Sequence, residues 1–112
     1  MNTLPYEYYI DIVTKSYFDG VDRYNLDQVL DCFHSDAVLT EVTSMTVHEG
    51  RDEGIAEMFK GLFEGFTHIW HGNFVHTVDI ESQSICSQFS VEITPPDGNE
   101  LRYENCNRFY LR

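Results

Sequence analysis

Glu41 is the residue of this chain whose type and position most clearly suit a reaction. The residues before it alternate, so that it shares one side of a predicted strand with Ala37 and Leu39. A carboxylate in such an apolar setting can act as a general base that moves a proton next to a carbonyl. The alternative is a carboxylate at the mouth of the sheet, solvated or paired with Arg51 or Arg108.

Asn107 is a second candidate, because a predicted strand pairing places it on a buried face. A hairpin that closes through residues 95–99 sets Phe89 against Asn105 and Ser87 against Asn107. The odd-numbered positions of both strands then share one mainly apolar face. A buried amide needs hydrogen-bond partners, which a ligand, a water or a neighbour such as Ser87 can supply.

The histidines do not have the spacing of metal ligands. His68 and His71 would face opposite sides of a predicted strand, and His68 and His76 would lie roughly 26 Å apart at about 3.3 Å per residue. No metal site is therefore predicted. His68 and His76 are expected to share a face with Trp70 and Phe74, where an imidazole either lines a pocket or is purely structural.

Three cysteines, Cys32, Cys86 and Cys106, make an odd number without CxxC spacing. This argues against a disulfide framework or a zinc knuckle and favours reduced thiols in a cytoplasmic protein. Cys86 and Cys106 are expected on the outer face of the sheet, diagonal to each other, and we interpret them as packing residues rather than a redox pair. No Gly-rich phosphate loop, serine elbow or Cys–His pair is present, which argues against nucleotide chemistry and acyl transfer.

The elements that must position these residues are arranged around the stretch 25–41. Asn25 is a good N-cap, and Gln28 can reach back to it as in a capping box, so a short helix is predicted to run to Phe33. The pattern changes after Phe33, and a strand covered on both sides is predicted for 37–43.

The rest of the chain divides into two further helices and three long strands. Apolar residues at steps of three and four predict helices over 5–19 and 51–66, and residues 20–24 are expected to end the first helix and turn the chain. Turn signals at 79–84 and 95–99 predict a meander of strands at about 68–79, 84–94 and 100–112. The predicted class is therefore α+β with a mostly antiparallel sheet.

Length and charge limit the other possibilities. A chain of 112 residues is expected to form a single domain over 1–112. A formal charge of −12 repels phosphate backbones and anionic lipid, so neither nucleic acid nor a membrane is an expected partner. No targeting segment or membrane-spanning run is predicted.

Three stretches together resemble the nuclear transport factor 2-like superfamily, and more narrowly its SnoaL-like and ketosteroid isomerase-like members. They are YFDGVDRYNLDQVLDCFHSDAVLTE at 17–41, HEGRDEGIAEMFKGLF at 48–63, and the strands that end in NCNRFYLR at 105–112. The resemblance implies a cone, in which a strongly curved sheet wraps around the N-terminal helices and leaves a pocket at the wide end. Members include isomerases, dehydratases, cyclases, epoxide hydrolases and non-catalytic modules, so the fold alone does not choose among them.

The isomerase branch of this family implies three catalytic positions. Its oxyanion-binding tyrosine falls at Tyr17, its general base at Glu41 and its second oxyanion donor at Asn107. The alternative for Tyr17 is the last core residue of the first helix. Glu41 replaces an aspartate, and Asn107 replaces a protonated acid but keeps a donor in its amide NH₂. The dehydratase branch implies that a histidine can line the pocket.

Two hypotheses follow. The first is an isomerase or dehydratase without a cofactor, which acts on a small apolar carbonyl or hydroxy compound. The second is a non-catalytic module that binds a small apolar ligand or forms a homodimer through its sheet. The family usually adds a strand after the position of Arg112, so either the chain is truncated or a partner covers an open side. The residues expected to line the pocket are Leu39, Phe59, His68, Trp70, Phe89, Val91, Ile93, Tyr103, Asn105 and Phe109.

Overall fold

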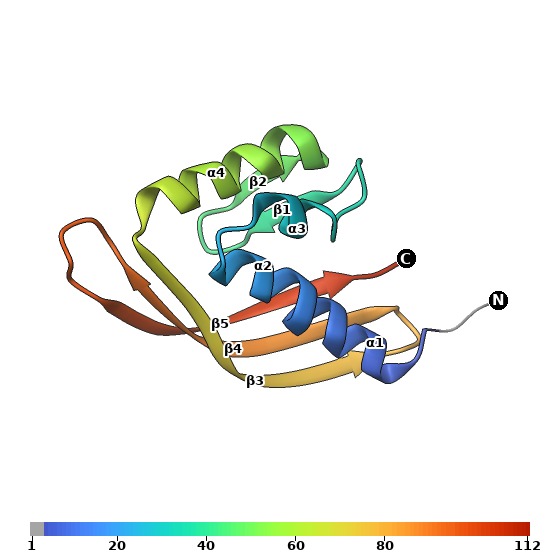
Figure 1. The fold of residues 1–112 in the computed structure, drawn as a ribbon. Coiled ribbons are helices and arrows are strands. Elements are labelled where there is room, and N and C mark those ends of the chain that lie inside the picture. Colours follow the sequence, from blue (N-terminus) through green and yellow to red (C-terminus); the bar gives the residue numbers. More distant parts are fainter. Residues whose placement is uncertain (1–3) are drawn as a thin grey trace.

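A curved three-stranded antiparallel sheet underlies the helices of the protein (Figure 1). The structure, a computed structural model, describes residues 4–112. The sheet has the order β3-β4-β5, and β1 pairs with β2 in a separate hairpin. These strands are β1 (Val38–Glu41), β2 (Thr46–Glu49), β3 (His68–Asp79), β4 (Ser84–Thr94) and β5 (Leu101–Tyr110). The predicted α+β class, with a curved antiparallel sheet around the N-terminal helices, is confirmed.

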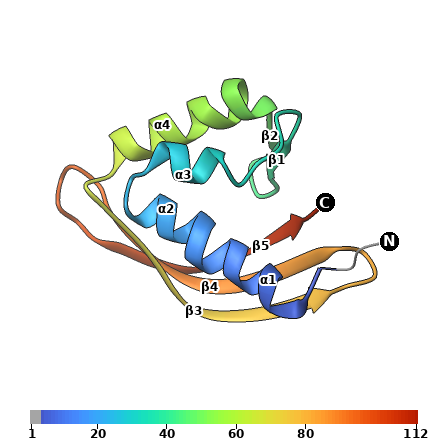
Figure 2. The same ribbon diagram turned by 45° about the vertical axis from the view of Figure 1, so that its right-hand side comes forward.

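A continuous helical rod lies across the concave face of this sheet (Figure 2). It is longer than the predicted helix and continues to Asp22 through the segment where a turn was expected. Its middle part has the wider π-helical turn, which shifts the register of the buried stripe. The rod consists of α1 (Tyr6–Asp11), η1 (Ile12–Phe18) and α2 (Asp19–Asp22). Its buried apolar residues are Tyr9, Val13, Tyr17, Phe18 and Val21.

The predicted capping box at Asn25 forms only in part. The Asn25 side chain accepts a hydrogen bond from the Gln28 N–H at 3.2 Å, as an N-cap should. The Gln28 amide, however, donates to the Ser16 carbonyl at 3.0 Å and to Asp19 Oδ2 at 2.9 Å. Gln28 therefore fastens α3 (Leu26–Leu30) to the rod instead of closing the box.

The predicted helix over 51–66 forms as two consecutive segments. The π-helical η2 (Gly50–Ile55) continues into α4 (Ala56–Gly65), whose buried Phe59 faces the core. A Cβ on Gly54 would lie 2.7 Å from the Glu49 backbone nitrogen, whereas a Cβ on Gly61 would meet nothing within 4 Å. Gly54 is therefore required for close packing, and Gly61 is not.

The predicted pairing of β4 and β5 is confirmed. Ser87 is paired with Asn107, Phe89 with Asn105 and Val91 with Tyr103. The five-residue connection between the strands sets this register, since a one-residue slip would turn the apolar side chains outward.

A bulge in β3 overturns one prediction about its faces. The pairing of β3 with β4 shifts between Gly72 and Val75, where Asn73 has a φ of 54°. His68 and Trp70 consequently face outward, whereas Phe74 and His76 beyond the bulge face the helices. The prediction that these four residues share one face is wrong.

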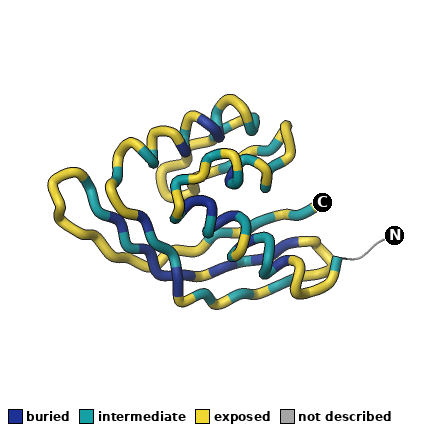
Figure 3. Tube along the Cα trace, in the orientation of Figure 1, coloured by how far each residue is buried: buried dark blue, intermediate teal, exposed yellow. Residues whose placement is uncertain are grey.

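Burial differs from the prediction at the tip of the β4–β5 hairpin. Leu101 and Tyr103 remain 50% and 46% exposed because the hairpin tip extends beyond the helices (Figure 3). The prediction that β1 is covered on both sides is also wrong: Val38 is 59% exposed, on the side away from the core.

Substitution of the two helical glycines tests the packing of η2 and α4. Gly54→Ala should lower the free energy of unfolding by about 2 kcal/mol, because the new methyl group collides with the backbone of β2. Gly61→Ala should raise it by up to about 1 kcal/mol, because alanine favours an open helix position. Urea unfolding of both variants measures this difference, and equal effects would contradict the close approach at Gly54.

Candidate functional site

Tyr17 lies inside an aromatic cluster beneath the rod. Its ring makes edge contacts with Phe18, Phe33, Phe59 and Phe109, at centroid distances of 4.7 to 6.1 Å. Burial raises the pKa of the Tyr17 phenol well above its ordinary value, so the hydroxyl keeps its proton. No hydrogen-bond partner for this hydroxyl is found among residues 4–112, and it is therefore a free neutral donor.

Glu41 is the last residue of β1, next to the turn of the β1–β2 hairpin, and its side chain is 52% exposed. Its Oε2 accepts a hydrogen bond of 2.7 Å from His48 Nε2. Arg51, one of the two arginines considered as its partner, pairs with Asp52 instead. Glu41 is thus a solvated carboxylate held by a histidine at the rim of the molecule.

Asn107 faces inward, half-buried, and lies opposite Ser87. The Ser87 hydroxyl shares a hydrogen bond of 2.8 Å with His76 Nδ1, so it is not reserved for Asn107. Asn105 is exposed and accepts a hydrogen bond from the Cys106 N–H. In the described part of the chain, no hydrogen bond joins any two of Tyr17, Glu41 and Asn107.

Asp22 and His71 form a polar pair that is largely shielded from solvent. Asp22 Oδ1 lies 2.6 Å from His71 Nδ1, and Asp22 Oδ2 accepts a hydrogen bond of 3.0 Å from the His71 main-chain N–H. The two side chains are only 22% and 11% exposed. The His71 ring lies 4.6 Å from Phe18 and 5.3 Å from Phe89, measured between ring centroids. A carboxylate therefore holds one nitrogen of an imidazole that is surrounded by aromatic rings.

Sequence reasoning missed this pair for two reasons. The segment 20–24 was interpreted as a turn, so Asp22 was not placed on a helix; in the structure it lies one turn beyond Phe18, on the same side of the rod. His71 was considered only as a metal ligand. His71 lies two residues after the apolar Ile69, on the same face of the strand, and this spacing was a signal that could have placed it on the inner face.

His76 is the second imidazole of the inner face. Its ring stacks on Phe74 at 5.4 Å with an interplanar angle of 12°, and its Nδ1 meets Ser87. Burial lowers the pKa of His76 below its ordinary value, because the charged form loses hydration there.

The Tyr9 hydroxyl is the one fully buried side-chain polar atom of the described residues that has no hydrogen-bond partner. Tyr9 itself is completely buried, in the part of the rod that contacts β3 and β4. A buried hydroxyl without a partner costs about 1–3 kcal/mol, so this position calls for a water or a ligand atom.

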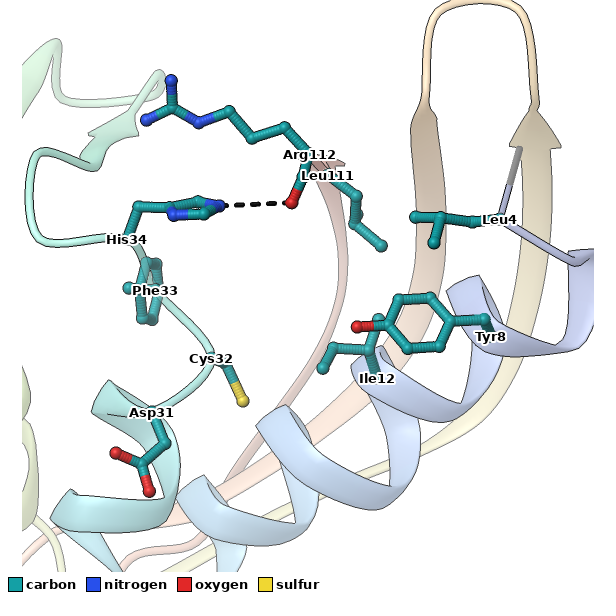
Figure 4. Close-up of a pocket in the computed structure, with 9 residues that line it drawn as sticks. All are labelled: Leu4, Tyr8, Ile12, Asp31, Cys32, Phe33, His34, Leu111 and Arg112. Atoms are coloured by element: carbon teal, nitrogen blue, oxygen red, sulfur yellow. Dashed lines mark hydrogen bonds between the residues drawn. The ribbon is translucent and has the colours of Figure 1, made fainter. Parts of the chain in front are cut away.

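A half-open hollow of about 290 Å³ lies between the rod, the segment after α3 and the end of the chain (Figure 4). His34 Nε2 and the Arg112 carbonyl oxygen, 3.3 Å apart, close one side of it. Burial, aided by the Asp31 carboxylate, raises the pKa of the Cys32 thiol on its wall to about 11. The nine lining residues are Leu4, Tyr8, Ile12, Asp31, Cys32, Phe33, His34, Leu111 and Arg112.

Neither a cluster of metal ligands nor a membrane-spanning helix is found in residues 4–112. No group of three or more His, Cys, Asp or Glu side chains lies close enough together to hold a metal ion. None of the helices has the length and apolar character needed to cross a membrane.

Comparison with known proteins gives the family. The sequence model of the SnoaL-like domain family matches residues 14–112, and the chain belongs to this family. A search of curated protein sequences gave no match.

Solved structures share the fold. A candidate isomerase from Bacillus subtilis superposes with a TM-score of 0.82 at 14% identity, over 100% of this chain and 81% of its own. A candidate polyketide cyclase from Xanthomonas campestris pv. campestris gives a TM-score of 0.79 at 16% identity, and the match covers 95% of this chain and 82% of the cyclase. A candidate aromatic ring hydroxylase from Novosphingobium aromaticivorans gives a TM-score of 0.70 at 26% identity, and the match covers 95% of this chain and 78% of the hydroxylase. The expected nuclear transport factor 2-like, SnoaL-like fold is confirmed.

Two histidine–carboxylate pairs that differ in burial allow a matched measurement of their strength. A double-mutant cycle with Asp22→Asn and His71→Gln should give a coupling energy of about 1–3 kcal/mol, because this pair is shielded from water. The same cycle with Glu41→Gln and His48→Gln should give less than about 0.5 kcal/mol. Chemical denaturation at neutral pH measures both, and equal couplings would show that burial does not strengthen the inner pair.

The lowered pKa of His76 predicts how stability depends on pH. As the pH falls below about 6.5, the unfolded chain binds a proton at this histidine before the folded protein does. The free energy of unfolding should therefore fall with pH in that range, and less steeply in His76→Gln than in the wild type. Unfolding curves between about pH 7.5 and pH 5 measure the two slopes, and parallel slopes would contradict the prediction.

Proposed function

We propose that this protein catalyses proton transfer on a small apolar carbonyl or hydroxy compound without a cofactor, and that His71 is the base. The observation that carries the proposal is the 2.6 Å contact between Asp22 Oδ1 and His71 Nδ1 inside an aromatic cluster. A charged group in such a place is costly unless it is paired, and here the pair leaves one imidazole nitrogen free for chemistry.

The geometry of the Asp22–His71 pair, a clamp of two hydrogen bonds, determines which nitrogen would react. A carboxylate beside Nδ1 favours the tautomer in which Nδ1 carries the hydrogen, and Nε2 is then the basic atom. The second oxygen of Asp22 accepts the His71 main-chain N–H, so the carboxylate cannot rotate without losing two hydrogen bonds. Asp22 would orient the ring and stabilise the imidazolium that forms when Nε2 takes a proton.

The same interior contains donors for the oxygen of a substrate. Tyr17 keeps its phenolic proton because burial raises its pKa, and its hydroxyl is not engaged by a described residue. Asn107 faces inward from β5, and the Tyr9 hydroxyl lacks a partner. Neutral donors in a dry interior stabilise a developing oxyanion more strongly than they would in water.

The proposed step removes a proton from the carbon next to a carbonyl group. His71 Nε2 takes that proton, the C–H electron pair forms the enolate, and Tyr17 or Asn107 donates to the enolate oxygen. Isomerisation follows if the proton returns to another carbon, and dehydration follows if a β-hydroxyl leaves as water with the proton. Glu41, the base suggested by the family resemblance, remains the alternative base within this proposal.

A second candidate function is non-catalytic binding of a small apolar ligand. The hollow beside Cys32 favours it, since this space is lined by several apolar side chains and lies apart from the Asp22–His71 pair. A homodimer through the outer face of the sheet belongs to the same alternative, and exposed Tyr110 would lie in such a contact. A cytoplasmic location remains a prediction from the reduced thiols.

Activity measurements with matched variants distinguish these functions. The substrates are small cyclic β,γ-unsaturated ketones and β-hydroxy ketones, whose conjugated enone products absorb in the ultraviolet. His71→Gln should lower kcat by a factor of about 10²–10⁴, since general base catalysis contributes that much. Asp22→Asn should also lower kcat, because the histidine loses its orienting carboxylate. His48→Gln, which breaks a similar pair at the rim, should retain the wild-type rate.

Each other outcome assigns a different role. Loss of activity in Glu41→Gln with an unaffected His71→Gln would make Glu41 the base. Full activity in both the Glu41→Gln and the His71→Gln variant would show that neither group transfers the proton. Ligand binding by calorimetry without turnover, in a protein whose mass by light scattering is that of a monomer or dimer, would support the binding module.

A further inference from the structure

Cys86 and Cys106 bring two thiols into contact on the outer face of the sheet. Their Sγ atoms lie 3.1 Å apart. Cys106 is exposed and Cys86 is half-buried, so small solutes can reach the pair from the solvent. The pair is on the opposite side of the sheet from the Asp22–His71 clamp and does not depend on the function proposed above.

The strand register explains this contact. Cys86 is directly opposite Arg108 and Cys106 is directly opposite Gln88, so the two cysteines are diagonal neighbours across β4 and β5. Diagonal positions are ordinarily about 7–8 Å apart between Cα atoms, and the twist of a sheet shortens one of the two diagonals. A disulfide needs sulfur atoms about 2.05 Å apart, so the two Sγ atoms, 3.1 Å apart, must approach each other by about 1 Å to form the bond.

We propose that Cys86 and Cys106 are a reversible dithiol–disulfide site that reacts with hydroperoxides and links β5 covalently to β4. One thiolate attacks the hydroperoxide, breaks its O–O bond and becomes a sulfenic acid while an alcohol, or water from hydrogen peroxide, leaves. The second thiol then attacks the sulfenic sulfur and expels water. Two thiols are oxidised by two electrons, one hydroperoxide is reduced, and a thiol reductant reverses the change.

The surroundings favour reaction at this pair over the third cysteine. Cys106 is exposed and has the Cys86 sulfur 3.1 Å away, so a sulfenic acid formed on either cysteine has a second thiol within reach. The hydrogen bond with Cys86 raises the pKa of the Cys106 thiol. Cys32 has its pKa raised to about 11 by burial and by Asp31, and its thiol donates to the Gln28 carbonyl. Cys32 is therefore an internal control of low reactivity.

The bond would change the freedom of β5. Among the described residues, this strand is hydrogen-bonded only to β4 along its length. Asn107 and Phe109 face the interior from β5, directly after Cys106. A disulfide would close the loop that contains the 95–99 turn and hold these inward side chains in a fixed place, which raises stability through the unfolded state.

Oxidation of the folded protein by one equivalent of hydrogen peroxide tests the site. We expect the intact mass to fall by about 2 Da, the mass of two hydrogens, with a peptide that joins Cys86 to Cys106 and with Cys32 still free for alkylation. The melting temperature should rise by roughly 5–15 °C and return on addition of dithiothreitol. Cys32→Ser should behave like the wild type.

Variants of the pair give the opposite result. Cys86→Ser and Cys106→Ser should each lose both the 2 Da change and the rise in melting temperature, and the remaining thiol should instead gain oxygen. Both substitutions are on the outer face, and urea unfolding of the reduced variants verifies that they fold. The proposal is overturned if the wild type gains oxygen without losing hydrogen, if the disulfide joins two chains on a non-reducing gel, or if Cys32 is oxidised first.

Discussion

The Asp22–His71 clamp determines where the helical rod lies on the sheet. It joins the last residue of α2 to the first part of β3 by two hydrogen bonds, one to the ring and one to the main chain. Apolar packing alone would permit the rod to slide along the concave face, because contacts between rings are not directional over a few tenths of an ångström. The clamp removes that freedom. Phe18 lies one turn earlier on the rod and covers His71, so the aromatic cluster and the clamp fix each other.

The inner face has more polar groups than packing requires. His71, His76, Ser87 and Asn107 all face the helices from β3, β4 and β5, where apolar residues of similar volume would cost less desolvation. Hydrogen bonds engage one ring nitrogen of His71, one ring nitrogen of His76 and the Ser87 hydroxyl, while the Tyr9 hydroxyl is left without a partner. Sequences usually depart from the most stable arrangement at positions that serve a function. These polar groups are therefore the part of the interior to which the proposed function is assigned.

Parts of this arrangement could be predicted from the sequence because they depend on short-range rules. The turn at 95–99 and alternation fixed the pairing of Ser87 with Asn107, and steps of three and four residues located the helix over 51–66. The bulge at Asn73 could not be predicted, since a single residue with positive φ in a strand leaves no periodic signal, yet it turns Phe74 and His76 inward. The clamp depends on a contact between residues 49 positions apart, which local patterns do not contain.

Two carboxylate–histidine pairs in one small protein show how burial, and not residue type, decides the possible role. Glu41 and His48 are as close as Asp22 and His71, at 2.7 Å against 2.6 Å. The Glu41 side chain is 52% exposed and that of Asp22 is 22% exposed, so water screens the first pair much more than the second. Strand alternation and the family resemblance both gave the catalytic position to Glu41, because neither includes the hydration of the side chain. A base needs a dry surrounding and a fixed orientation, and within the described residues the pair that offers both is Asp22–His71.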